Sequence, residues 1–112
     1  MGSVPEKSIK LIETSIFHTL INAYLSPLDC WEMQESLALN PEKGSVIRGT
    51  KGMRKVRWSV PGKGKSGGLR VIYHWDSTEK CPVLFFLFVY RKSEQGDLSA
   101  KQIKTLIDEL EA

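Results

Sequence analysis

Four cationic side chains and one tyrosine occur on segments that predict neighbouring strands. Lys55 and Arg57 are two positions apart in an alternating segment, so their side chains share one face of the predicted strand. Arg70 opens the next alternating segment, and Tyr90 and Lys92, again two apart, stand where the following segment ends. Because consecutive strands are usually adjacent in space, we expect these five side chains to form one cluster.

A cluster of this kind could cut RNA without a metal ion, because the 2′-hydroxyl of RNA can itself attack the adjacent phosphate. The protein must then accept the hydroxyl proton, stabilise charge on the crowded phosphate and protonate the leaving oxygen. Lysine and arginine supply positive charge, and a lysine desolvated among other cations can lose its proton near neutral pH. The same side chains could equally serve only to bind an RNA backbone, and their spacing does not decide between the two functions.

The charges are unevenly distributed along the 112 residues, although the net charge is only +3. Residues 43–75 contain nine basic residues and no aspartate or glutamate. The rest of the chain carries seven basic and thirteen acidic residues, a balance of −6. A basic region of this length favours a polyanion through phosphate contacts and counter-ion release, so we expect a nucleic acid partner rather than only a solvated charged surface.

The glycine- and lysine-rich segment 61–68 contains the pattern G-x-G-x-x-G, but its context does not fit a nucleotide site. A strand follows it where a dinucleotide site needs a helix, and the first glycine of a P-loop would fall at Ser59. We expect a basic loop that can approach a phosphate backbone closely, because glycine has no side chain. The residues that we assign to RNA binding rather than catalysis are Arg54, Lys63, Lys65 and His74.

Metal-dependent chemistry is not expected. Two-metal sites need clustered carboxylates, whereas the acidic residues here are scattered. The two histidines, His18 and His74, fall on a predicted helix and a predicted strand, which does not favour a paired-histidine nuclease. Cys30 and Cys81 are too few for a disulfide framework or a metal cage, and they suit reduced thiols in the cytoplasm. We therefore predict no metal and no cofactor.

The first half of the sequence predicts a strand and two helices. Residues 8–13 alternate as a short strand, and Thr14 can then cap a helix with an apolar stripe at helical spacing. Ser26 and Pro27 are typical of the N-cap and first position of a second helix, which ends before Pro41. Two helices joined so tightly predict a helical hairpin.

The second half predicts three strands and a final helix. Residues 54–59 and 69–75 alternate, and residues 83–90 are apolar on both faces, as in a central strand. Their short connections predict an antiparallel meander. Ser99 and Gln102 form a capping box in front of a last amphipathic helix.

Together these elements predict a single α+β domain over residues 1–112. A small antiparallel sheet, made of the N-terminal strand and the three-stranded meander, is packed by the helical hairpin and the C-terminal helix. Trp58, Tyr73 and Trp75 are expected to pack under the helices, facing away from Arg70. No segment approaches the roughly 18 apolar residues that cross a bilayer, and the N-terminus lacks a signal-peptide pattern, so we expect a cytoplasmic protein without a membrane partner.

Short motifs follow one another at specific intervals along nearly the whole sequence. They are Ser15-Ile16-Phe17, Leu39-Asn40-Pro41 with Gly44, Gly52-Met53-Arg54-Lys55-Val56-Arg57, Gly62-Lys63-Gly64-Lys65-Ser66-Gly67-Gly68-Leu69-Arg70-Val71-Ile72-Tyr73, Tyr90-Arg91-Lys92-Ser93-Glu94 and Asp97-Leu98. In this succession the chain resembles the RelE/ParE superfamily of bacterial toxins and is most similar to the HigB type. The resemblance implies a RelE-like fold.

The resemblance also implies a function, the toxin of a type II toxin–antitoxin system. Such a toxin is an endoribonuclease, or mRNA interferase, that inhibits translation by cleaving messenger RNA in the A site of the 30S ribosomal subunit without a metal. The implied partner is a cognate antitoxin, often with a helix-turn-helix DNA-binding domain. Contact with operator DNA would then occur only through the antitoxin.

Carried over by position, the resemblance implies a role for each residue of the cluster. Lys55 and Arg57 would be the basic residues of the active-site strand, and Arg70 would hold the scissile phosphate. Lys92 would assist the leaving group. Tyr90 would stack on or position a base, a contact worth roughly 1–3 kcal/mol.

The sequence leaves more than one candidate for the general base and more than one class of function. Some relatives carry a functional tyrosine just before or within the last helix, and residues 97–99 have none. Lys55 is therefore our first choice of base, and His74, on the strand face of Arg70, is the substitute. The alternative functions are a non-enzymatic toxin like the ParE-type inhibitors of DNA gyrase, and a simple RNA-binding module.

Overall fold

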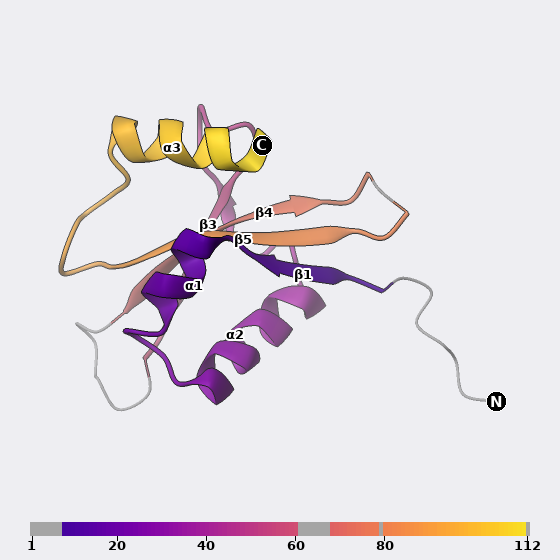
Figure 1. Ribbon diagram of the computed structural model, residues 1–112, viewed down its shortest axis with the longest axis horizontal. Helices are drawn as coiled ribbons and strands as arrows, with labels where there is room; N and C mark the ends of the chain where they lie inside the picture. Colours follow the sequence, from indigo (N-terminus) through magenta and orange to yellow (C-terminus); the bar gives the residue numbers. More distant parts are fainter. Residues whose placement is uncertain (1–7, 61–67, 79, 112) are drawn as a thin grey trace.

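The computed structural model describes residues 8–60, 68–78 and 80–111, which form an α+β fold (Figure 1). The helices and strands lie close to their predicted positions, and no helix in these ranges is long and apolar enough to cross a membrane. In chain order the elements are β1 (Lys10–Glu13), α1 (Ser15–Ile21), α2 (Pro27–Leu39), β2 (Ser45–Val46), β3 (Arg54–Trp58), β4 (Leu69–Asp76), β5 (Val83–Arg91) and α3 (Ala100–Glu111).

The strands form one mixed sheet in the order β1-β5-β4-β3-β2, which corrects the predicted antiparallel sheet. The meander β3-β4-β5 is antiparallel as predicted, but β1 pairs with β5 in parallel, with Lys10 opposite Val83. Parallel neighbours need a long crossover, which the intervening elements supply here. Alternation in a sequence shows which side chains share a face but not the direction of the neighbouring strand. The two-residue strand β2 adds a fifth strand at the other edge.

One face of the sheet is covered by α1 and α2, which lie together on the side opposite α3 (Figure 1). Phe17 and Met33 of these helices are fully buried, and the ring centroids of Phe17 and Phe86 are 5.4 Å apart. Both helices pack on the same sheet face, as the predicted helical hairpin requires. The expectation for Trp58, Tyr73 and Trp75 is confirmed, because all three belong to or pack against this core.

The opposite face carries a smaller core under α3, and a β-bulge brings Tyr90 into it. Tyr73 pairs with Phe86 while Ile72 pairs with Phe88, so Leu87 is the extra residue in β5. Strict alternation would place Tyr90 on the face of Phe86, under α1 and α2. Because the bulge inserts one residue, Tyr90 instead packs with Ile72, Leu87 and Leu106. Tyr90 thereby shares a face with Arg70.

The predicted helix starts are confirmed in the structure. The Thr14 hydroxyl accepts a hydrogen bond from the Phe17 backbone N–H, and the Ser26 hydroxyl accepts one from that of Asp29. The Ser99 and Gln102 side chains each accept a hydrogen bond from the other's backbone N–H, at 3.1 and 3.0 Å. Each cap satisfies a donor that the helix itself leaves free.

Candidate functional site

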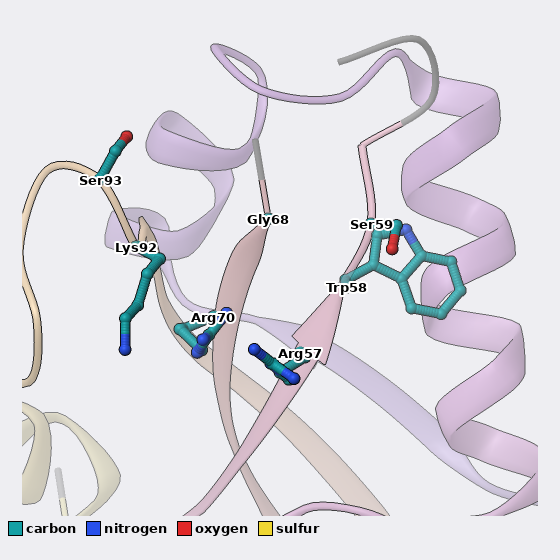
Figure 2. A pocket seen from close by; sticks show the side chains of 7 residues that line it. All are labelled: Arg57, Trp58, Ser59, Gly68, Arg70, Lys92 and Ser93. Carbon is teal, nitrogen blue, oxygen red and sulfur yellow. The ribbon is translucent and has the colours of Figure 1, made fainter. Parts of the chain in front are cut away.

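An open pocket of about 440 Å³ lies where β3 and β4 approach the segment after β5. Its cationic lining residues are Arg57, Arg70 and Lys92 (Figure 2). Figure 2 shows the guanidinium groups of Arg57 and Arg70 turned toward each other, with Lys92 beyond Arg70. The Trp58 side chain points away from them, toward a helix.

The strand register explains why these side chains meet. Arg57 is the direct partner of Arg70 in the β3–β4 ladder, and Arg70 is the direct partner of Tyr90 in the β4–β5 ladder. Directly opposed residues have Cβ atoms roughly 4.5–5.5 Å apart. Lys92 follows the end of β5, and its backbone N–H donates to the Gly68 carbonyl at 3.2 Å. The positive charges of Arg57, Arg70 and Lys92 therefore lie close together at one end of the sheet.

Arg70 is the buried member of this group, with only 8% of its surface exposed. Within the described ranges no carboxylate forms an ion pair with Arg70 or Arg57. Like charges placed opposite each other on a sheet repel, and a buried charge is costly unless it is paired. The pair of guanidinium groups therefore favours an anion between them, and phosphate is an anion that arginine side chains commonly bind.

Tyr90 lies beside Arg70 as a core residue. It is 2% exposed, so its ring has no free face on which a base could stack, in contrast to the role that the resemblance implied. Its hydroxyl is buried and forms no hydrogen bond with the described residues. Burial raises the pKa of Tyr90, the negative charge of Asp97 raises it further, and Arg70 opposes both effects. Tyr90 thus stays a phenol whose proton is free to be donated.

Asp97 is the residue of this site that sequence reasoning missed. It lies between β5 and α3, and its Oδ1 is 3.5 Å from Nζ of Lys55. The pKa of Asp97 is lowered, first because its carboxylate accepts the Leu98 backbone N–H at 2.9 Å, then because of the charge of Lys55, with a smaller effect of Lys92. In the sequence, Asp97 belongs to a family motif but to no alternating pattern. The sequence therefore does not predict that the loop between β5 and α3 brings Asp97 to Lys55 of β3.

Arg54 and His74 do not join the pocket. Arg54 donates to the backbone carbonyls of Gly44 and Glu42, at 2.7 and 3.1 Å, and so holds the loop after α2. His74 lies on the face of Arg70 but four residues along β4, which is roughly 13 Å away. Its Nδ1 is buried without a partner in the part of the chain that is described. Lys63 and Lys65, predicted to bind RNA, lie outside the described residues.

No protein-family model matches the chain. In residues 8–60, 68–78 and 80–111, no group of three histidine, cysteine, aspartate or glutamate side chains is placed to hold a metal ion. The described site is a pocket lined by Arg57, Arg70 and Lys92, with the Lys55–Asp97 ion pair on neighbouring segments, and such a group of cations is suited to binding an anion.

Proposed function

We propose that the chain is an endoribonuclease, the toxin of a type II toxin–antitoxin system that cleaves messenger RNA without a metal. The observation that carries this proposal is the convergence of Arg57, Arg70 and Lys92, from three successive segments, on one open pocket. Their charges suit a phosphate in a crowded transition state. Cleavage in the ribosomal A site, a cytoplasmic location and control by an antitoxin with a helix-turn-helix domain are proposed on the resemblance to RelE/ParE-superfamily toxins.

In the proposed reaction the 2′-oxygen attacks the adjacent phosphorus, a 2′,3′-cyclic phosphate forms, and the 5′-oxygen leaves with a proton. Arg57 and Arg70 stabilise the charge on the two non-bridging oxygens. Lys92, an exposed residue that lines the same pocket, donates the proton to the leaving oxygen. Tyr90, the direct partner of Arg70 in the sheet, is buried and is not among the residues that line the pocket, so we assign it no contact with the phosphate.

In this scheme Asp97 accepts the proton of the 2′-hydroxyl. Lys55 was the first choice from the sequence, but its amine is engaged as the ion-pair partner of Asp97, with 3.5 Å between Nζ and Oδ1. His74 lies too far along β4 to serve. Among the described carboxylates, Asp97 is the one that pairs with a member of the predicted cluster, Lys55, and the charges of Lys55 and Lys92 both act on it. Lys55 then contributes positive charge rather than taking the proton.

Single-turnover kinetics on ribosomes programmed with a messenger test this proposal against simple RNA binding. We expect Arg70→Ala and Lys92→Ala each to slow cleavage about 100-fold or more, with affinity for the programmed ribosome reduced far less. Lys104→Ala, an exposed charge on α3 outside the pocket, is the matched control and should behave as wild type.

Three results would contradict the proposal. A parallel loss of affinity and cleavage in the two pocket variants would assign these residues to binding alone. A loss in Lys104→Ala of the same size would show that net charge, not the pocket, matters. Intact messenger with wild type, together with inhibition of gyrase supercoiling, would favour the non-enzymatic alternative.

A further inference from the structure

The outer side of α2 exposes an apolar stripe that the fold does not use. Leu28, Trp31 and Leu39 are 67%, 54% and 83% exposed, and they are three of the four large hydrophobic side chains that stand exposed in the described part of the chain. Met33 and Leu37, on the other side of the same helix, are fully buried against the sheet. Leu28 and Trp31 are three residues apart, and Leu39 follows eight residues later, about two helical turns, so all three lie on one side of the helix. Exposed apolar surface of this kind marks interaction sites.

Every charged side chain on α2 is acidic. Glu32 and Glu35 lie within the exposed stripe, and Asp29 stands in the first turn. None of the three forms an ion pair with another described residue. In a protein of net charge +3, α2 is thus a locally negative surface. We call Leu28, Trp31, Glu32, Glu35 and Leu39 the α2 face.

Hollows lie on both sides of the α2 face. One, of about 280 Å³, lies between α1 and α2 and is bordered by Trp31 and Pro27. The other, of about 570 Å³, lies at the end of α2 and is bordered by Glu35, Leu39 and Trp58. A ridge with a hollow on each side can receive side chains from two rows of an opposing helix.

We propose that the α2 face binds a basic amphipathic helix of another protein, with leucine-like residues at helical spacing flanked by lysine or arginine. The apolar stripe supplies the buried contact, and Glu32 and Glu35 select positive flanking charges. A second copy of the chain fits poorly, because two such faces would oppose their acidic residues. A nucleic acid is repelled for the same reason. The inference does not depend on RNA cleavage, because no residue of the α2 face lines the pocket of Arg70; Trp58 alone borders both that pocket and the hollow beside Leu39.

Peptide binding to the full chain tests this proposal directly. The probe is a 15-residue helix-forming peptide of leucine and lysine, compared with a scrambled peptide of the same composition and with a version in which glutamate replaces lysine. Affinity is measured by titration calorimetry, and the contact is located by NMR shifts of the Trp31 indole. We expect the basic helix to bind at the α2 face and the other two peptides to bind at least about tenfold more weakly.

A charge-swapped protein provides the decisive comparison. Glu32→Lys with Glu35→Lys should weaken the basic helix about tenfold and strengthen the acidic one, whereas Asp108→Lys with Glu109→Lys, the same charge change on α3, should alter neither. Leu28→Ser with Trp31→Ser should weaken both helices. Equal binding of the scrambled and ordered basic peptides would overturn the proposal, as would a charge swap without effect. Dimerisation in sedimentation experiments that Trp31→Glu abolishes would also overturn it, because a second copy would then cover the face.

Discussion

Arg70 is buried and has no ionic partner among the residues that the structure describes. Its direct neighbours in the sheet are Arg57, which repels it, and Tyr90, whose hydroxyl is buried and free of partners in the described ranges. A core position normally excludes such a charge, because its burial lowers stability unless a counter-charge is present. The most direct physical reason for an arginine here is that an anion binds to it in the working protein.

Replacing Arg70 by methionine tests this reasoning, because methionine keeps most of the side-chain volume and removes the charge. We expect the free energy of unfolding in urea to stay the same or to rise by about 1 kcal/mol, while cleavage is lost. A fall of more than 1 kcal/mol would show instead that Arg70 is needed for the fold.

Replacing Asp97 by asparagine distinguishes Asp97 from Lys55 as the group that accepts the proton of the 2′-hydroxyl. If Asp97 takes the proton, Asp97→Asn should lower the cleavage rate at neutral pH about 100-fold, with RNA binding equal or tighter because a negative charge has been removed. If Lys55 is the base, the same change should keep or raise the rate, since it frees the Lys55 amine from its carboxylate partner. Single-turnover rates measured between pH 5 and 9 distinguish the two, and an Asp97→Asn variant as fast as wild type would contradict our assignment.

At the scale of elements, local signals were predicted well and long-range geometry was not. The caps at Thr14, Ser26 and Ser99 are encoded within a few residues, so the sequence reveals them. The parallel pairing of β1 depends on the whole chain between it and β5. The bulge at Leu87 cannot be read from a segment that is apolar on both faces, yet it decides which face Tyr90 occupies.

The same contrast holds for the site. Arg57, Arg70 and Lys92 were predicted together because alternation and short strand connections fix both their face and their neighbours. His74 satisfies the same alternation, but distance along the strand separates it from the pocket. Asp97 reaches Lys55 through the path of a loop, for which the sequence has no periodic signal.

The turn after β5 contacts Tyr24, which lies between α1 and α2. These contacts fix the start of the segment that carries Lys92. The Tyr24 hydroxyl donates to Glu94 Oε1 at 2.6 Å, and the Arg91 guanidinium lies 5.4 Å from the centre of the Tyr24 ring. The pKa of Glu94 is lowered, first by this hydrogen bond. The tether joins residues 70 positions apart, and it holds the backbone on either side of Lys92.

Removing the tether should change catalysis more than stability. Tyr24→Phe keeps the ring under Arg91 but loses the hydrogen bond, so we expect the cleavage rate to fall about three- to tenfold, with affinity for the programmed ribosome unchanged. Because the bond is exposed, the free energy of unfolding should fall by less than about 1 kcal/mol. A Tyr24→Phe rate equal to that of wild type would show that Lys92 needs no such support.

At the scale of the whole molecule, the sheet separates two surfaces of opposite character. The helices α2 and α3 lie on opposite sides of the sheet (Figure 1). The sheet face that packs α3 carries the cations of β3, β4 and the end of β5, whereas the outer side of α2 is apolar and acidic. The sequence already contained this division as a basic middle between acidic ends. In the fold the cationic pocket and the α2 face carry opposite charge, and we propose that RNA binds the first and a protein partner the second, with Trp58 bordering both the pocket and the hollow beside Leu39.

The central claim is that this pocket cuts messenger RNA on the ribosome, and primer-extension mapping of a translated messenger tests it most directly. Wild type, the Arg70→Ala, Lys92→Ala double variant and Lys104→Ala are each assayed with and without ribosomes. We predict cuts that appear only with ribosomes, persist in Lys104→Ala and vanish in the double variant. Intact messenger with wild type on ribosomes, or unchanged cuts in the double variant, would contradict the claim.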